Sequence, residues 1–310
     1  MFHTAPHNLV LTTDKSRRIF SDAAGTKRIK AVILVFRRWR ASLPAQMGWR
    51  TGCGVRYCEK PLVNTPPPLD ARAALFIDVD GTLLEIAPRP ELVRVPPELP
   101  GMLDRLAAKR DGALALVSGR PLSQIDSLFR PWCGAASGLH GSERRRADCT
   151  MDGSGMADAD RAAGAALDRL RPTLAELAAR DSRLLLEDKG ATVALHYRAA
   201  PERAAELRRQ VEALLGEAGA PLRLIAGKQV LEFQPRHRNK GVAIAAFLEE
   251  APFRDRMPVF LGDDVTDEDG FAEVNRRDGI SIRVGAPAHT AARHALPSVT
   301  AVLAWLARGD

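Results

Sequence analysis

From residue 72 onward, short apolar segments alternate with stretches of helical periodicity. The apolar strand patterns cover 73–77, 112–117, 258–261 and 280–284, and the helical patterns cover 98–110, 240–250, 267–276 and 299–307. Strands that alternate with helices form mostly parallel sheets, which helices cover on both faces. The sequence therefore predicts an α/β fold with a parallel sheet at its centre.

The middle of the chain has a different pattern. Long helical stretches rich in Ala, Leu and Arg cover 157–180 and 201–217, and strand patterns occur at 184–188, 192–197, 222–225 and 230–233. Two strand pairs with two helices indicate an α+β insertion. We therefore expect a core formed by 71–142 and 236–310, interrupted by an α+β cap over 143–235.

The first 70 residues form a basic segment without sustained periodicity. They hold 12 Lys/Arg and 4 Asp/Glu, whereas the remainder is nearly neutral. The prolines at 66–68 indicate a stiff boundary. We expect residues 1–70 to be a poorly ordered, non-catalytic extension. A loosely docked extension, a start codon placed too early (with Met47 as an internal start) and a short membrane-surface helix over 29–41 are the alternatives.

The composition is that of a globular protein, with 45% hydrophobic and 27% charged residues. The sequence contains no apolar run near the roughly 20 residues of a membrane span. Four cysteines in 310 residues do not form a disulfide framework. A near-neutral body with a basic leader does not favour nucleic acid or membrane as a partner. We therefore expect a cytoplasmic protein, and a monomer, that acts on a small molecule.

Three polar clusters follow the predicted core strands. They are Asp78-Val79-Asp80-Gly81-Thr82, Ser118-Gly119-Arg120 and the segment 262–267, which contains Asp263, Asp264 and Asp267. In open α/β sheets, ligands bind beyond the carboxyl ends of the strands, so these clusters should converge. Crowded carboxylates repel one another, and Mg²⁺, which takes oxygen ligands and substrate phosphate, removes that conflict. The clusters predict Mg²⁺ together with a phosphoryl ligand.

This ordered set of motifs resembles the haloacid dehalogenase (HAD) superfamily of phosphatases. The set comprises Asp-x-Asp-Gly-Thr, Ser-Gly-Arg, a lysine that opens a later helix (Lys240) and Gly-Asp-Asp-x-x-Asp, and it extends from 73 to about 300. The resemblance implies a Rossmann-like parallel-sheet core with an inserted cap. It also implies that phosphate monoesters are hydrolysed with Mg²⁺ as the cofactor.

The resemblance implies a role for each residue of the motifs. Asp78 is the expected nucleophile, which forms an aspartyl-phosphate, and Asp80 is the expected general acid and base. The expected metal ligands are Asp78, Asp80, Asp263 and Asp264, with Asp267 as their support. The expected phosphate-binding residues are Gly81, Thr82, Ser118, Gly119 and Lys240.

The motifs of the cap are similar to those of the trehalose-6-phosphate phosphatase family. They lie at 187–190, 193–198 and 227–235, and the segments 138–143 before the cap and 262–268 in the core add to the similarity. The resemblance implies that trehalose 6-phosphate is hydrolysed to trehalose and phosphate; a sucrose-phosphate or hexose-phosphate phosphatase is the alternative. The expected contacts of the cap and hinge to the sugar are His140, Glu187, Lys189 and Glu232, whereas His196 is interpreted as a strand histidine.

One position departs from this family. The stretch Glu232-Phe233-Gln234-Pro235 carries Gln234 where the family usually has a basic residue. A glutamine donates hydrogen bonds but carries no charge. Arg236 and Arg238 are the candidates to supply the missing charge.

Overall fold

The computed structural model describes residues 65–87, 92–152, 158–286 and 289–310. The expectations for the basic leader concern residues that lie almost entirely outside these ranges. None of the helices in the described ranges is long and apolar enough to span a membrane.

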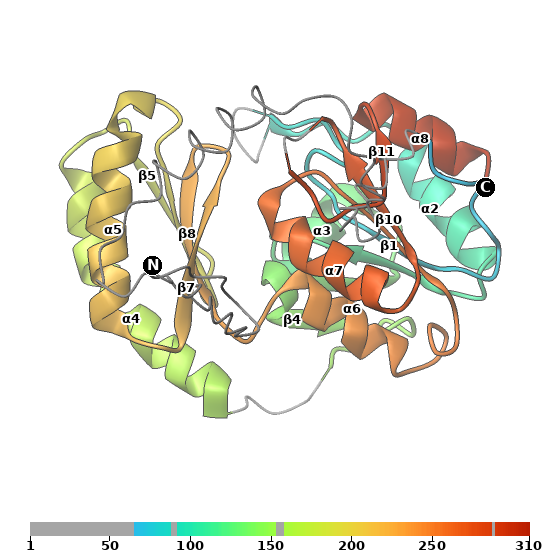
Figure 1. Cartoon of the computed structure of the whole chain (residues 1–310), viewed down its shortest axis with the longest axis horizontal. Coiled ribbons are helices and arrows are strands. Elements are labelled where there is room, and N and C mark those ends of the chain that lie inside the picture. The colour runs from blue at the N-terminus through green and yellow to red at the C-terminus, as the bar shows by residue number, and fades with distance from the viewer. Residues whose placement is uncertain (1–64, 88–91, 153–157, 287–288) are drawn as a thin grey trace, which may run out of the picture. The chain divides into compact units, whose positions relative to one another are not determined.

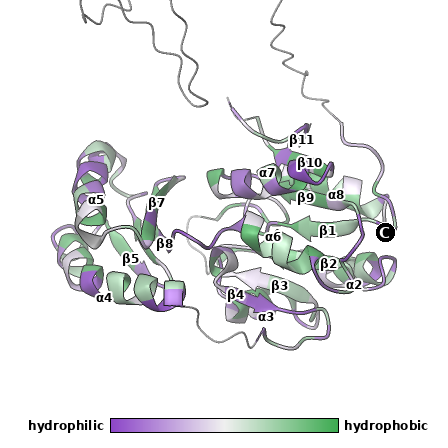
Figure 2. Cartoon of the chain, turned by 60° about the horizontal axis from the view of Figure 1, so that its bottom comes forward, coloured by the Kyte–Doolittle hydropathy of each residue, from purple (hydrophilic) through white to green (hydrophobic). Residues whose placement is uncertain are grey.

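Within the described part of the chain, seven strands form one sheet in the order β11-β10-β9-β1-β2-β3-β4. Neighbouring strands run parallel except for β4, which is antiparallel to β3. The strands are β1 (Ala74–Ile77), β2 (Leu114–Val117), β3 (Ala135–Gly138), β4 (Glu143–Arg145), β9 (Pro258–Gly262), β10 (Ile280–Val284) and β11 (His294–Leu296). Figure 2 shows the hydrophobic residues along β1 and β9 at the centre of the sheet.

Helices cover both faces of this sheet (Figure 1). One face of β1, with Leu75 and Ile77, packs against α2, α3 and α8, and the other, with Ala74 and Phe76, packs against α6 and α7. The helices are α2 (Leu99–Ala108), α3 (Leu122–Phe129), α6 (Lys240–Leu248), α7 (Glu268–Arg276) and α8 (Val299–Ala307). Because both faces are buried, each core strand is a short apolar run rather than an alternating one.

A second sheet lies between β4 and α6 in the chain. Its four described strands are antiparallel in the order β5-β6-β8-β7, with β5 (Leu185–Asp188), β6 (Val193–His196), β7 (Leu222–Gly227) and β8 (Val230–Pro235). The helices α4 (Asp158–Ala179) and α5 (Ala204–Ala218) pack on it around a separate apolar cluster that includes Leu167, Leu207 and Phe233. We call residues 158–235 the cap and the described residues of the seven-stranded sheet and its helices the core.

The fold confirms the predicted α/β class. The observed β10 and α8 match the predicted ranges, and the remaining predicted elements differ by a few residues at their ends. The division into domains at 142/143 stays a prediction, and Glu143–Arg145 pairs with β3 in the core sheet. The sequence analysis missed β3, β4 and β11, which are only three or four residues long.

An ion-paired cluster joins the start of α4 to the segment that follows β8. Asp160 on α4 accepts hydrogen bonds from Arg238 Nη2 at 2.6 Å and Nε at 3.0 Å, and its Oδ1 lies 2.7 Å from His237 Nε2. The hydrogen bond from Arg238 lowers the pKa of Asp160 to about 2, with His237 adding to the effect and burial opposing it. This cluster connects the two points at which the chain enters and leaves the cap.

Candidate active site

Asp78 lies at the carboxyl end of β1, the strand between β9 and β2. Its amide donates to the carbonyl of Leu261 on β9 at 3.0 Å, which continues the ladder one residue beyond the strand. The residue is only 4% exposed. An aspartate in this place is positioned by the buried central strand of the sheet.

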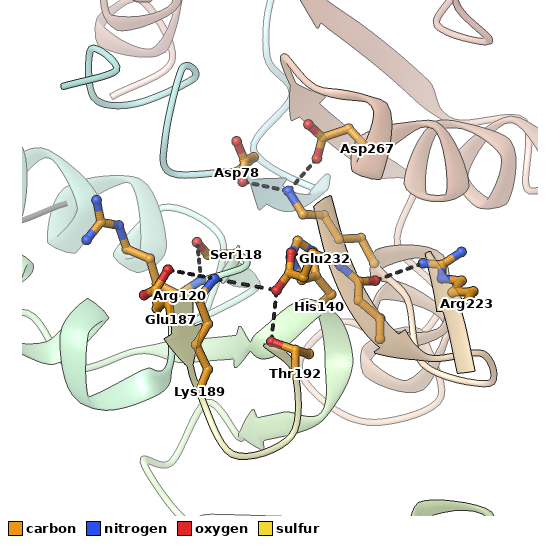
Figure 3. Close-up of polar contacts among 12 residues, drawn as sticks. Asp78, Ser118, Arg120, His140, Glu187, Lys189, Thr192, Arg223, Glu232 and Asp267 are labelled. Carbon is orange, nitrogen blue, oxygen red and sulfur yellow. Dashed lines mark hydrogen bonds and ion pairs between the residues drawn. The ribbon is translucent and has the colours of Figure 1, made fainter. Parts of the chain in front are cut away.

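Lys240 joins Asp78 to a second carboxylate. Lys240 begins α6, and its Nζ donates to Asp78 Oδ1 and to Asp267 Oδ1, both at 2.6 Å (Figure 3 labels both acceptors). All three residues are buried. Burial alone would lower the pKa of Lys240, but Asp267 and Asp78 outweigh it and raise that pKa, so the ammonium stays charged.

Asp263 completes a group of three carboxylates. One oxygen each of Asp78, Asp263 and Asp267 lies within 4.8 Å of the others. Asp263 approaches over Gly81, where a Cβ atom would lie 2.2 Å from Asp263 Oδ2, and Gly81 has φ +87°. Any side chain at position 81 would therefore displace the carboxylate. Gly81 therefore leaves room for Asp263, which lies in the loop after the neighbouring strand β9.

The electrostatics of this group favour a bound cation. Burial raises the pKa of Asp78 well above its usual value; the neighbouring carboxylates of Asp267 and Asp263 add to the rise, while Lys240 opposes it. Asp263 Oδ1 is buried and has no hydrogen-bond partner among the described residues. Clustered carboxylates with an unpartnered oxygen fit a hard divalent cation, which takes oxygen ligands.

The carboxylates of Asp80 and Asp264, also assigned to the metal by the sequence, lie outside this group. Asp80 forms a two-pronged ion pair with Arg120, at 2.6 Å to Nε and 2.7 Å to Nη2. Asp264 caps the short helix η4 (Val265–Asp267) with its side chain. Asp267, expected only as a support, lies inside the group. It also accepts from the amides of Asp263 and Asp264 at 2.9 and 2.8 Å, which fixes the loop.

The predicted phosphate-binding residues lie around Asp78. Ser118, at the end of β2, is buried, and its Oγ accepts from the Arg120 amide at 3.1 Å. Thr82 Oγ1 is buried without a partner among the described residues, which leaves a hydroxyl for a ligand. Gly119 lies against the ring of His140, so no side chain fits there.

Glu232 on β8 is the centre of a polar network in the cap. It accepts from Thr192 Oγ1 at 2.8 Å, Lys189 Nζ at 3.4 Å and Gln234 Nε2 at 3.2 Å, and it lies 3.2 Å from His140 Nε2 of the core (Figure 3). Burial opposes ionisation of Glu232, but Lys189 and His140 outweigh it and lower its pKa. The structure therefore brings three of the predicted sugar contacts together.

Glu187, the fourth predicted sugar contact, lies on β5 near Lys189. Its carboxylate is 3.6 Å from Lys189 Nζ and 2.9 Å from His196 Nε2. The pair with Glu187 accounts for His196 as a strand histidine. His140 itself has a left-handed backbone, with φ 53° and ψ 32°, which aims its ring from the core toward Glu232.

The structure corrects the expectation for the charge missing at Gln234. Arg236 donates to the carbonyl of Ala220, and Arg238 pairs with Asp160, so neither reaches Gln234. The basic residue beside Gln234 is Arg223, its register partner on β7, which donates to Gln234 Oε1 at 3.3 Å and to Asp269 on α7 at 2.8 Å. A cross-strand neighbour on a sheet has no fixed spacing in the sequence, which hid this pair.

Sequence reasoning also left two residues of the site without a role. Arg120 is the last residue of the Ser-Gly-Arg motif. Its contact with Asp80 requires the ends of β1 and β2 to be adjacent, as the predicted parallel sheet implied. Lys228 lies in the segment 227–235, one of the motifs of the cap, and its Nζ lies 2.6 Å from Asp263 Oδ2. No sequence signal indicated this second contact, because it joins the cap to the core.

The fold and the site together define the class of protein. A parallel α/β core interrupted by an α+β cap, with aspartates and a lysine at the carboxyl end of its central strands, is the arrangement expected from the resemblance to phosphatases of the HAD superfamily.

Comparison with known proteins narrows the class. The family model described as trehalose-phosphatase matches residues 76–299, and the chain belongs to this family. It is 47% identical over 69% of its length to the "Probable trehalose-phosphate phosphatase" of Sinorhizobium fredii, covering 78% of that protein. It is 42% identical over 80% of its length to the trehalose-6-phosphate phosphatase of Escherichia coli, covering 90% of it.

A solved structure shares the fold. A protein described as related to trehalose-6-phosphate phosphatase superposes with a TM-score of 0.61 at 26% identity, covering 75% of this chain and 95% of that one. The family match over residues 76–299 includes both the core and the cap.

Proposed function

We propose that this protein hydrolyses trehalose 6-phosphate to trehalose and phosphate, with Mg²⁺ as its cofactor and an aspartyl-phosphate on Asp78 as the intermediate. The observation that carries the proposal is the buried group of Asp78, Asp263 and Asp267 tied by Lys240 at the carboxyl end of β1. The family match and the two bacterial relatives support the choice of substrate.

The cation site would use the carboxylates of Asp78, Asp263 and Asp267. A bound Mg²⁺ supplies charge neutralisation for the phosphoryl group and relieves the repulsion among these carboxylates. Lys240 adds a fixed positive charge beside the nucleophile, since its two carboxylate partners hold it in place. The hydroxyl of Thr82 is available to a phosphoryl oxygen.

The reaction takes place in two transfers. In the first, a carboxylate oxygen of Asp78 attacks phosphorus, the bond from phosphorus to the sugar oxygen breaks, and Asp80 protonates that oxygen. In the second, Asp80 takes a proton from water, whose oxygen attacks phosphorus and releases Asp78. Both carboxylate oxygens of Asp80 accept hydrogen bonds from Arg120, so this pair must open before Asp80 can deliver a proton.

The polar network of the cap would bind the hydroxyl groups of the sugar. Glu232, Lys189 and Glu187 present two carboxylates and an ammonium within one cluster, and a disaccharide offers many hydroxyls that need such partners. His140 connects the network to the core through Glu232, so sugar binding and phosphate binding would share one closed site. Closure would also keep bulk water from the aspartyl-phosphate.

A substrate panel tests the proposal. The full chain with Mg²⁺ should release phosphate from trehalose 6-phosphate with a much larger kcat/KM than from glucose 6-phosphate or sucrose 6-phosphate. A preference for either of the latter two would contradict the assigned substrate and would leave the phosphatase chemistry intact.

A further inference from the structure

Lys228 is a cap residue that reaches the carboxylates of the core. It lies in the two-residue loop between β7, which ends at Gly227, and β8, which begins at Val230. Its Nζ donates to Asp263 Oδ2 at 2.6 Å, and Asp263 belongs to the group of three carboxylates. The ammonium of Lys228 thus reaches the carboxylate group from the cap, whereas that of Lys240 reaches it from the core.

The β7–β8 hairpin lies close enough to the loop of Asp263 and Asp264 for Lys228 to reach it. A Cβ atom on Gly227 would lie 3.3 Å from Asp264 Oδ2, so a small residue lets the loop sit on the aspartate loop. β7 packs beside η4, and Arg223 on the same strand pairs with Asp269 of α7. Two cations of one hairpin therefore contact the core, and only Lys228 contacts the catalytic carboxylates.

The two lysines of the site differ in their freedom. The side chain of Lys240 is 3% exposed and has two carboxylate partners, whereas that of Lys228 is 55% exposed and has Asp263 as its carboxylate partner. An ammonium on a long, half-exposed side chain can change partner at small cost because solvent screens the pair that it leaves. Lys240 is fixed in place, and Lys228 can move.

The charges indicate where Lys228 goes. Three carboxylates and two ammonium groups leave one net negative charge on this group. A phosphate monoester dianion needs a positive site. Once a divalent cation neutralises Asp263, that carboxylate attracts Lys228 less, whereas the incoming dianion attracts it more. The dianion then has cations on both its core and its cap side.

We propose that Lys228 is a phosphate-binding residue of the cap, whose ammonium passes from Asp263 to the phosphoryl oxygens of the substrate as the substrate binds. This inference rests on the proposed phosphatase function and deepens it. It makes recognition of phosphate, and not only of the sugar, dependent on the cap.

The experiment compares four variants of the full chain, with inorganic phosphate and p-nitrophenyl phosphate as probes that carry no sugar. Lys228→Met removes the charge and Lys228→Arg keeps it. Arg223→Met removes the other cap-to-core ion pair of the hairpin, and Arg208→Met removes an exposed i,i+4 pair with Glu212 on α5. Phosphate affinity is measured by calorimetry with Mg²⁺ present, and turnover with p-nitrophenyl phosphate and with trehalose 6-phosphate.

Lys228→Met should weaken phosphate binding and lower kcat/KM for both esters by roughly 10- to 100-fold, the loss of one charge-assisted hydrogen bond. Lys228→Arg should keep most of the affinity, because the charge remains. Arg223→Met and Arg208→Met should bind phosphate as the parent does, although Arg223→Met should weaken recognition of trehalose 6-phosphate through Gln234 and Glu232.

Two outcomes would overturn the inference. In one, Lys228→Met binds phosphate with the affinity of the parent. In the other, Arg223→Met loses as much phosphate affinity as Lys228→Met, which would make the hairpin a mechanical latch. Failure of the proposed substrate looks different, since trehalose 6-phosphate would then be a poor substrate of the parent while the effect of Lys228→Met on phosphate and on p-nitrophenyl phosphate remained.

Discussion

The two polar networks of this molecule, one in the core and one in the cap, are built differently. In the core, Asp78, Lys240 and Asp267 are buried at the end of a strand whose residues are all buried. In the cap, Glu232 is buried, but the side chains of its partner Lys189 and of Glu187, which pairs with Lys189, are 14% and 24% exposed. The strand β5 is partly exposed along its length.

This difference indicates that the core network serves the chemical step and the cap network serves recognition of the substrate. Groups that are fixed by buried ion pairs keep their geometry without a substrate, which suits the chemical step. Groups on a half-exposed sheet exchange water for hydroxyls as a ligand arrives, which suits recognition. We therefore expect changes in the core network to lower kcat and changes in the cap network around Glu232 to raise KM for the sugar substrate.

The largest effect is expected from Asp78→Asn. The variant loses the proposed nucleophile, and its turnover should fall by about 10⁴-fold or more with every phosphate ester. The isosteric amide removes one of three crowded carboxylates, so the fold should persist. Circular dichroism and thermal unfolding check the fold, and phosphate release checks the activity. Comparable turnover in a folded variant would break the assignment of chemistry to the core.

Removal of the cation should come next in size. Chelation should lower phosphate release at least about 100-fold, since the charge on the transferred group loses its main counter-charge, and added Mg²⁺ should restore it. Asp263→Asn should raise the Mg²⁺ concentration needed for half activity far more than Asp264→Asn, because only Asp263 lies in the carboxylate group. Equal effects of the two variants would contradict the observed grouping.

The variant Glu232→Gln tests whether the cap network acts in recognition of the sugar rather than in the chemical step. It removes the charge that Lys189, Thr192 and His140 surround. KM for trehalose 6-phosphate should rise by roughly 10- to 100-fold, the range for hydrogen bonds to a charged group, while kcat/KM for p-nitrophenyl phosphate stays near that of the parent. A parallel loss for both esters would show that the cap network takes part in the chemistry.

The smallest effect is expected at the junction of cap and core. The folded-state pKa of Asp160 is about 2, below the roughly 3.9 of an unfolded aspartate. Its contribution is therefore present above about pH 4 and is lost as the pH falls toward 2. Asp160→Asn should lower the free energy of unfolding by about 1 kcal/mol at pH 7, allowing for solvent screening.

Urea unfolding of the parent and of Asp160→Asn at several pH values measures this effect. The difference between the two proteins should shrink as the pH falls from about 4 toward 2, while kcat at pH 7 stays close to that of the parent. A difference that does not depend on pH would mean that the ion pair with Arg238 is not its source.

Much of the core could be predicted from the sequence because the patterns that position its functional side chains are local in the sequence. Each functional side chain follows an apolar strand or begins a helix, and parallel strands place their carboxyl ends together, so Asp78, Lys240 and Asp263 were expected in one place. Spacing could not tell which carboxylates would face one another. The carboxylate of Asp80 pairs with Arg120 instead of joining the group, and that of Asp264 caps the start of η4.

The cap was less predictable for a physical reason. Contacts between antiparallel strands and between cap and core depend on register and on how the cap meets the core, and neither leaves a fixed spacing in the sequence. Arg223 beside Gln234 and Lys228 on Asp263 are contacts of this kind. The position of Glu232 was expected, but its contact with His140 required the structure.

The most direct test of the account is to find where the phosphoryl group resides during turnover. The enzyme is mixed with trehalose 6-phosphate and Mg²⁺, quenched in acid within a turnover and digested, and its peptides are examined by mass spectrometry. We predict one phosphoryl group on the peptide that contains Asp78, absent from Asp78→Asn. A phosphoryl group on another residue, or full turnover by Asp78→Asn, would contradict the account.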